Sequence, residues 1–487
     1  MRPELRSLVL FLSIALSSAF VFATTPTIKV TSPSNNSTSA SPVHFEATAT
    51  SSACANGISA VRVYSAPGVS AYTVAGGSLN AYLNLNAGTY DTTIVAWDNC
   101  GGTATASVTV TASGEKKIGG FLYTVNSGYD YGNNTNNVVG FSIVASNGAL
   151  APLLQGPVDT NIFPQSVASD KGGYRLYVGD WQSGDVFAYF INRSNGYLTP
   201  VPGAPFPVHR SVTAVAVHPS GDFVYAAASE QAPGDGIAVF QVQSDGSLTE
   251  ISGSPFSTEI GPQALVVDPA GNYLYVADGY SNYIQAFQIN RSTGALTQVA
   301  GSPYSISIPA SCNPGTGASA LPNDIVDVSG KSIYTPDLFI GYVSGWSVSP
   351  TTGSLVAMSG SPFIDGGCAE NQYSMGPLPW SLAVDGTGKF MYVNNSSSFD
   401  AIYSIGANGA LTYLKTSGAT GGQTPIRTDA AGNYLYTDYT FNGAGACNCM
   451  MGYSINHTTG DITELPGSPF MYEEETTAVI NSFVVTP

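Results

Sequence analysis

The sequence predicts an all-β protein built from an N-terminal β-sandwich and a seven-bladed β-propeller. Tyr, Val, Thr and Gly are abundant, and charged residues, which include the helix-favouring Glu, Lys and Arg, make up only 10% of the 487 residues. Short segments between residues 25 and 113 alternate apolar and polar positions, as the strands of a sandwich do. From residue 121 the chain repeats itself at intervals of roughly 45–60 residues, which is typical of blades arranged in a ring.

The N-terminus is expected to be an export signal. Arg2 and Arg6 precede an uncharged apolar run from Leu8 to Ala23, and Val21 and Ala23 form the small-residue pattern of a cleavage site. This run is short for a membrane helix, and no later segment is apolar enough to span a bilayer. We therefore expect residues 1–23 to be removed and the protein to be secreted or periplasmic, with attachment to the cell surface left open.

The charge balance restricts the partners. The chain has 15 Lys and Arg against 32 Asp and Glu, a net charge of −17. Nucleic acid repels such a protein, so no nucleic-acid partner is expected. No motif for a cofactor or a metal ion is recognised, and we expect a monomer.

Residues 24–113 resemble the bacterial Ig-like domains of exported proteins. The resemblance rests on the alternating segments and above all on GTYDTTIVAWDNCGG at 88–102. Cys54 and Cys100 follow two of the expected strands, and we expect a disulfide between them. The polar, Gly-rich segment GEKKIGG at 114–120 is the expected linker, and the propeller is expected to span residues 121–487.

Two interleaved marks define the repeat. A tyrosine closes an apolar strand at Tyr123, Tyr177, Tyr225, Tyr275, Tyr334, Tyr392 and Tyr436. A Gly-x-Leu or Gly-x-Ile follows each of them, at Gly148, Gly196, Gly246, Gly294, Gly353, Gly409 and Gly460. Because the two series alternate without a gap, the sequence predicts seven blades.

The first repeat lacks an inner strand of its own. It begins at the second strand, FLYTVN (121–126), whereas the chain ends with NSFVVTP (481–487), which is similar to the inner strand ALVVDP (264–269). We therefore expect the C-terminal strand to complete the first blade and to close the ring, which leaves no exposed sheet edge.

The repeat P-x-x-[AV]-x-x-P-x-G-x-[YF]-[LV]-Y-V, followed by N-x-x-[TS]-G-x-L-T, resembles the lactonase-type propellers across all seven units. These include bacterial 6-phosphogluconolactonases, fungal carboxymuconate cyclases and proteins with Tyr-Val-Thr-Asn repeats. The resemblance implies a catalytic face where inner strands begin and second strands end, with Arg, His and Glu in place. The matching positions here are 262–264 and 278–280, with 211–213 and 323–324 where histidines belong, and none carries Arg, His or Glu. We therefore expect the family's catalytic site to be absent, unless an offset alignment hides it elsewhere on the ring.

Several residues at this end of the ring are candidates for a binding face. The carboxylates that end second strands have two interpretations, a ring of ligand-binding groups or caps of repeated turns. The aromatic side chains could stack on sugar rings, contact a protein, or only pack blades together. The candidates are His209, Arg210, Gln263, Asp180, Asp278, Asp337, Trp181 and Trp380.

Four further cysteines belong to the loops of the same face. We expect Cys312 to pair with Cys368 and Cys447 with Cys449, the second pair being the less constrained by the sequence. A cross-loop pairing and a four-cysteine metal site remain alternatives.

The sequence favours a protein that is not an enzyme, whose loop-rich face binds a saccharide or a protein. The alternative is a lactone hydrolase resembling 6-phosphogluconolactonase. Export argues against this alternative, because the phosphorylated sugar lactone is a cytosolic metabolite. A redox or metal-binding propeller, resting on the four cysteines, is the third hypothesis.

Overall fold

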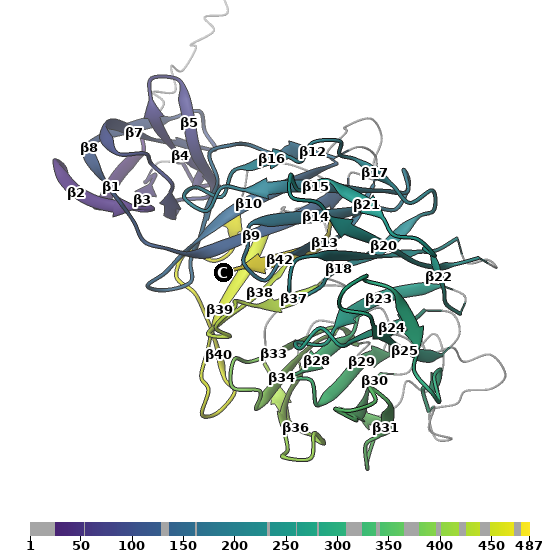
Figure 1. Ribbon diagram of the computed structural model, residues 1–487. Coiled ribbons are helices and arrows are strands. Elements are labelled where there is room, and N and C mark those ends of the chain that lie inside the picture. The colour runs from purple at the N-terminus through teal and green to yellow at the C-terminus, as the bar shows by residue number, and fades with distance from the viewer. Residues whose placement is uncertain are drawn as a thin grey trace, which may run out of the picture.

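The structure, a computed structural model, consists of β-strands in two domains (Figure 1). It describes residues 25–52, 54–127, 136–160, 163–230, 234–259, 261–279, 282–307, 324–337, 341–364, 379–395, 401–417, 425–438, 449–471 and 479–487. Within these ranges there is no helix with the length and apolar character needed to cross a membrane.

The N-terminal domain is a sandwich of two sheets. One sheet has the order β1-β3-β6 and the other the order β2-β8-β7-β4-β5. The strands are β1 (Thr27–Ser32), β2 (Ser37–Ser41), β3 (Val43–Thr50), β4 (Ile58–Ala66), β5 (Val69–Ala75), β6 (Ser78–Leu83), β7 (Gly88–Asp98) and β8 (Thr103–Lys116). Phe45 and Leu79 of the first sheet pack with Val61 and Ile94 of the second, because alternate residues of each strand point inward. The Ig-like assignment of this sandwich stays a prediction.

The disulfide expected in this domain is confirmed. Cys54 and Cys100 are bonded, with 5.7 Å between their Cα atoms. The segment 114–120, expected as a linker, contains the end of β8 and the start of β9, with Lys117 between the two strands.

The propeller is confirmed, and the described residues form seven sheets in it. Blades 1 to 3 consist of β9 (Ile118–Ser127), β10 (Asn137–Val144), β11 (Leu150–Pro152) and β12 (Val158–Asp159); β13 (Pro164–Ser169), β14 (Arg175–Asp180), β15 (Asp185–Ile191), β16 (Leu198–Pro200) and β17 (Phe206–Pro207); and β18 (Val212–Val217), β19 (Phe223–Ala228), β20 (Gly236–Val242), β21 (Leu248–Glu250) and β22 (Phe256–Ser257).

Blades 4 to 7 follow the same antiparallel order. They consist of β23 (Pro262–Val267), β24 (Tyr273–Asp278), β25 (Tyr283–Ile289), β26 (Leu296–Gln298) and β27 (Tyr304–Ser305); β28 (Val326–Val328), β29 (Ser332–Asp337), β30 (Tyr342–Val348), β31 (Leu355–Ala357) and β32 (Phe363–Ile364); β33 (Pro379–Val384), β34 (Phe390–Asn395), β35 (Ala401–Ile405) and β36 (Leu411–Thr416); and β37 (Ile426–Thr428), β38 (Tyr434–Asp438), β39 (Cys449–Ile455), β40 (Ile462–Glu464) and β41 (Phe470–Met471).

The C-terminal strand closes the ring, as predicted. β42 (Val479–Thr486) pairs antiparallel with β9, and Val484 lies opposite Tyr123. The first blade therefore takes its inner strand from the end of the chain, and Figure 1 shows this yellow strand beside the blue β9. The unpaired edge that the first blade would otherwise expose is thereby covered.

The two sequence marks of the repeat meet at the interfaces between blades. The hydroxyl of Tyr123 in blade 1 donates to the carbonyl oxygen of Gly196 in blade 2 at 2.8 Å. The same bond joins Tyr275 to Gly353, Tyr334 to Gly409, Tyr392 to Gly460 and, from the last blade to the first, Tyr436 to Gly148. The ring of each of these tyrosines is fully buried in the apolar clusters that fill the seams between blades.

The marker glycines allow this close approach. Gly353 has a φ of 70°, and a Cβ atom there would lie 2.2 Å from the ring of Tyr273 in blade 4. Gly294 has a φ of 75°, and its Cβ would lie 2.5 Å from the ring of Phe223 in blade 3. Any other residue would therefore strain the backbone and push the neighbouring blade away.

The sandwich is docked against blades 1 and 7, the two blades at the closing seam (Figure 1). The Asn84 side chain donates to the carbonyl oxygens of Ala151 and Pro152 at 3.1 and 2.9 Å, and Asn147 donates to the Tyr82 hydroxyl at 2.9 Å. On the blade 7 side, burial raises the pKa of Tyr72 to about 12, although a hydrogen bond with the Met471 backbone opposes this. The domain therefore bridges the start and the end of the propeller.

The Tyr–Gly bond makes a measurable contribution to stability. Replacing Tyr123 with Phe removes a buried hydrogen bond and leaves the Gly196 carbonyl oxygen without this donor, so we expect a loss of about 1 kcal/mol. The matched control is Tyr225→Phe, because the buried Tyr225 hydroxyl has no hydrogen-bond partner among the described residues and its removal should cost nothing. Urea unfolding of the two variants measures the difference, and equal losses would contradict the assignment.

A buried carboxyl group makes stability depend on pH. Burial raises the pKa of Asp327, the middle residue of β28, from 3.8 to about 6. The backbone N–H of Gly330 opposes the rise and the charge of Asp268 adds to it. A folded-state pKa above the unfolded value means stability that is fully present below about pH 4 and is lost as the pH rises through 6.

The Asp327→Asn variant should not show this loss. At pH 7 we expect it to be more stable than the natural protein by about 1 kcal/mol, a value reduced for the partial exposure of the group. Thermal unfolding between pH 4 and pH 7.5 measures the effect, with Asp222→Asn at an exposed turn as the control. Parallel curves for Asp327→Asn and the natural protein would contradict it.

Candidate functional site

A cavity of about 350 Å³ occupies the mouth of the central channel, at the end where the inner strands begin. Because the strands of each blade are antiparallel, the second strands end at this mouth and the turns between first and second strands lie at the opposite end. The described residues that line the cavity are Gln165, Ser166, Val167, Thr213, Ala214, Val215, Gln263, Ala264, Leu265, Gly279, Asp324, Trp380, Ser381, Pro425, Arg427, Asn481 and Ser482.

A bulge at the start of five inner strands supplies much of this wall. In blade 4, Pro262 lies opposite Asp278 and Ala264 opposite Ala277, so Gln263 is left outside the ladder. A bulge of this kind turns a side chain away from its usual direction. The residues at the equivalent shifts are Gln165, Thr213, Gln263, Trp380 and Asn481, and all of them line the cavity.

Some of these side chains are fixed by hydrogen bonds and others have free polar groups. The Thr213 hydroxyl donates to the Pro262 carbonyl oxygen at 2.7 Å, and the Asn481 amide donates to the Pro164 carbonyl oxygen at 2.7 Å. The side-chain amides of Gln165 and Gln263 have no hydrogen-bond partner among the residues that the structure describes. Their donors and acceptors are therefore available to a ligand in the cavity.

Asp324, Ser381 and Arg427 form a hydrogen-bonded cluster in the same wall. Arg427 Nη1 donates to Asp324 Oδ2 at 3.0 Å and to Ser381 Oγ at 2.9 Å, and Ser381 Oγ donates to Asp324 Oδ2 at 2.6 Å. The backbone N–H groups of Leu382 and Ile325 also donate to Asp324, at 3.0 and 2.9 Å. The cluster thus joins blades 5, 6 and 7 and holds one carboxylate and one guanidinium at the cavity.

This pair is partly desolvated. The side chain of Asp324 is 13% exposed and that of Arg427 is 35% exposed. A charged pair in such surroundings interacts more strongly than one in bulk water. Chemically, the guanidinium can stabilise a negative charge that develops on an oxygen atom, and the carboxylate can accept a proton.

The candidates chosen from the sequence are dispersed. Gln263 and Trp380 line the cavity. Asp180, Asp278 and Asp337 are fully buried at the ends of β14, β24 and β29. Asp180 caps the following loop, where its carboxylate accepts hydrogen bonds from the N–H groups of Gln182 and Ser183 at 3.0 and 2.7 Å.

The remaining candidates lie outside the described cavity lining. His209 is exposed and has a φ of 64°. Arg210 forms ion pairs with Asp235 and Glu230 at 3.2 and 3.5 Å. Trp181 is 44% exposed and contacts the edge of the Phe163 ring.

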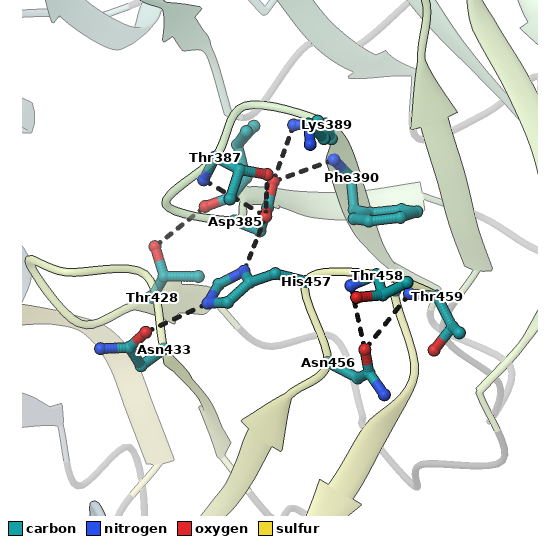
Figure 2. Close-up of polar contacts among 12 residues, drawn as sticks. Asp385, Thr387, Lys389, Phe390, Thr428, Asn433, Asn456, His457, Thr458 and Thr459 are labelled. Atoms are coloured by element: carbon teal, nitrogen blue, oxygen red, sulfur yellow. Dashed lines mark hydrogen bonds and ion pairs between the residues drawn. The ribbon is translucent and has the colours of Figure 1, made fainter.

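A second polar cluster lies at the opposite end of the ring, between blades 6 and 7 (Figure 2). His457 Nδ1 is 2.9 Å from Asp385 Oδ2, and its Nε2 is 3.1 Å from the side-chain oxygen of Asn433. Burial acts to raise the pKa of Asp385, but hydrogen bonds from Thr387, from the Phe390 N–H and from His457 hold it below its usual value. Asp385 also accepts the backbone N–H of Phe390 within its own turn, so the cluster connects two turns and stabilises the seam.

Three of the four loop cysteines, Cys312, Cys368 and Cys447, lie outside the described residues. Cys449 begins β39 and is disulfide-bonded. Its partner therefore belongs to the other three, and both expected pairings, Cys312–Cys368 and Cys447–Cys449, stay predictions.

Sequence reasoning missed Arg427 and gave Asp324 no role. The family resemblance places a basic residue at the first positions of the inner strands, whereas Arg427 lies further along its strand, opposite the marker tyrosine Tyr436. The signal that could have found it is the presence of an Arg at an inner-strand position where blades 2, 3, 4 and 6 have Ala168, Ala216, Val266 and Ala383.

The comparisons with known proteins agree with the propeller fold. The family model described as "Lactonase, 7-bladed beta-propeller" matches residues 199–308. No curated protein matches the sequence.

Among solved structures, the periplasmic gluconolactonase of Pseudomonas aeruginosa is similar with a TM-score of 0.57 and 14% identity, over 75% of this chain and 99% of that one. A candidate 6-phosphogluconolactonase of Bacteroides uniformis has a TM-score of 0.56 and 18% identity, over 75% and 99% of the two chains. One from Bacteroides fragilis has the same TM-score and identity, over 75% and 98%. The chain therefore has the seven-bladed propeller fold of these structures, and within it residues 199–308 match the lactonase family model.

Proposed function

We propose that this protein hydrolyses a polyhydroxylated lactone in the cavity at the channel mouth. The observation that carries the proposal is the Asp324–Arg427 pair, placed in the cavity wall beside the unpartnered amides of Gln165 and Gln263. Within the described residues the pair supplies both charges that the reaction needs, and it occurs in a propeller of the lactonase type.

The reaction requires one proton acceptor and one site for a negative charge. Water adds to the lactone carbonyl carbon while the Asp324 carboxylate accepts a proton from it, and the carbonyl oxygen becomes an oxyanion. Arg427 stabilises this oxyanion. The bond between the carbonyl carbon and the ring oxygen then breaks, and the ring oxygen takes the proton from Asp324 to become a hydroxyl group. The product is the open-chain hydroxy acid, which ionises in water.

The remaining wall suits a sugar-derived ring. The Gln165 and Gln263 amides can each donate to and accept from ligand hydroxyl groups, and the half-buried Trp380 indole offers an aromatic face. The cavity of about 350 Å³ is at the small end of ligand pockets, which fits a single ring better than a longer saccharide.

Export does not oppose this proposal. One of the similar structures is described as a periplasmic gluconolactonase, so lactone hydrolysis outside the cytosol occurs with this fold. The comparisons give no support to the binding module without catalysis that the sequence favoured. We therefore retain secretion or periplasmic location as part of the proposal, together with a non-cytosolic lactone.

The test is hydrolysis of δ-gluconolactone by the purified mature protein, corrected for spontaneous hydrolysis. We expect saturable turnover, and a fall in kcat of about 100-fold in Arg427→Met and in Asp324→Asn, since each variant removes a charge used in the transition state. The matched control is Arg291→Met, at an exposed turn at the opposite end of the ring, which should keep full activity.

Folding must be separated from catalysis in these variants, because the cluster also joins three blades. The Gln263→Ala variant loses no hydrogen bond within the described part of the protein. We therefore expect it to raise KM several-fold without changing the midpoint of thermal unfolding. Binding of the lactone without turnover in the natural protein would overturn the proposal in favour of a binding module. Equal activity in Arg427→Met and Arg291→Met would also overturn it.

A further inference from the structure

We infer that the cavity takes an uncharged sugar lactone and rejects its phosphorylated form. This inference rests on the proposed lactone hydrolysis and names its substrate class. The similar structures are described as a gluconolactonase and as 6-phosphogluconolactonases, and the substrates that these names give differ by one phosphate group. The charges at the channel mouth decide between them.

The described cavity wall has no net charge. Its one guanidinium, Arg427, is paired with its one carboxylate, Asp324, at 3.0 Å. Arg427 Nη1 is shared among three acceptors, Asp324, Ser381 and the Ile426 carbonyl oxygen. The charge of the one guanidinium in the wall is therefore balanced by the Asp324 carboxylate, and no second cation lines the described cavity.

The propeller segments outside the described residues add no further Lys or Arg, as their sequence shows. The segments 128–135, 161–162, 231–233, 280–281, 308–323, 338–340, 365–378, 396–400, 418–424, 439–448 and 472–478 contain neither Lys nor Arg. Several contain acids instead, among them Asp365, Glu370 and Glu473.

The other basic residues of the propeller lie elsewhere. Arg210 is the one further cation at the mouth end in the described chain, and it is paired with Asp235 and Glu230. Lys415 is on the outer strand β36 and pairs with Asp461. The rest lie in or beside turns at the opposite end, namely Lys171, Arg175, Arg193, Arg291, Lys331 and Lys389.

A phosphate group is therefore unfavourable at this mouth. A dianion that leaves water needs charge-assisted hydrogen bonds from Arg or Lys to offset its desolvation. Here it would meet amides, hydroxyls and an aromatic ring, in a protein whose net charge is −17. An uncharged lactone has no such cost and can use the same amides and hydroxyls as partners.

The experiment compares kcat/KM of the mature protein for δ-gluconolactone and 6-phosphogluconolactone at the same ionic strength. We expect a preference of at least about 30-fold for the uncharged lactone. Equal or greater activity on the phosphorylated lactone would overturn this inference and leave the proposed hydrolysis standing. Activity on neither lactone would overturn the proposed function itself.

A cation introduced into the wall should reverse part of the preference. Gln263→Lys places an ammonium group in the cavity, and we expect kcat/KM for the phosphorylated lactone to rise about tenfold, with a rise that diminishes in high salt. The control Gln298→Lys makes the same change on an exposed position of the outer strand β26. An equal rise in both variants, or none in Gln263→Lys, would overturn the local explanation.

Discussion

The hydrogen bond from the buried tyrosine of one blade to the glycine carbonyl oxygen of the next is the contact on which the ring depends. It is present in five of the seven seams, where the apolar clusters also lie, and one of these is the seam from blade 7 back to blade 1. The hydroxyls of Tyr177 and Tyr225 have no such partner among the described residues. The glycine makes the bond possible, since its left-handed backbone lets an aromatic side chain of the preceding blade lie against it. Each blade is thus positioned by its neighbour through residues that are far from the channel mouth.

Because the contacts between blades stabilise the ring, the first residues of the inner strands are not needed for blade packing. The bulges at these positions place one side chain in the channel from each of five blades: two glutamines, a threonine, a tryptophan and an asparagine. A substitution at one of them changes the wall of the cavity without altering the ladder of its blade. The repeat therefore fixes the scaffold, and its exceptions determine the chemistry.

This division explains what the sequence could predict. The tyrosine and glycine series predicted the number of blades, because both marks recur at equivalent positions of every unit. The similarity of NSFVVTP (481–487) to the inner strand ALVVDP (264–269) predicted the closing strand. The cavity could be predicted only in part, through Gln263 and Trp380, because no recurring pattern governs its residues. Arg427 approaches Asp324 across 103 positions of sequence, and only the ring brings them together. The carboxylates Asp180, Asp278 and Asp337 do recur; all three are fully buried at strand ends, and Asp180 caps the following loop.

The cluster of Asp324, Ser381 and Arg427 lies where the inner strands depart most from the regular repeat. The inner strands of blades 5 and 7, β28 and β37, each have three residues, whereas those of blades 2, 3, 4 and 6 have six. The shorter ladders leave room at the mouth, and side-chain hydrogen bonds across three blades replace the missing backbone ones. The same bonds hold the guanidinium and the carboxylate in fixed positions, which is the preorganisation that the proposed hydrolysis requires. At this end of the ring, the irregularity that would weaken the fold is therefore also what forms the site.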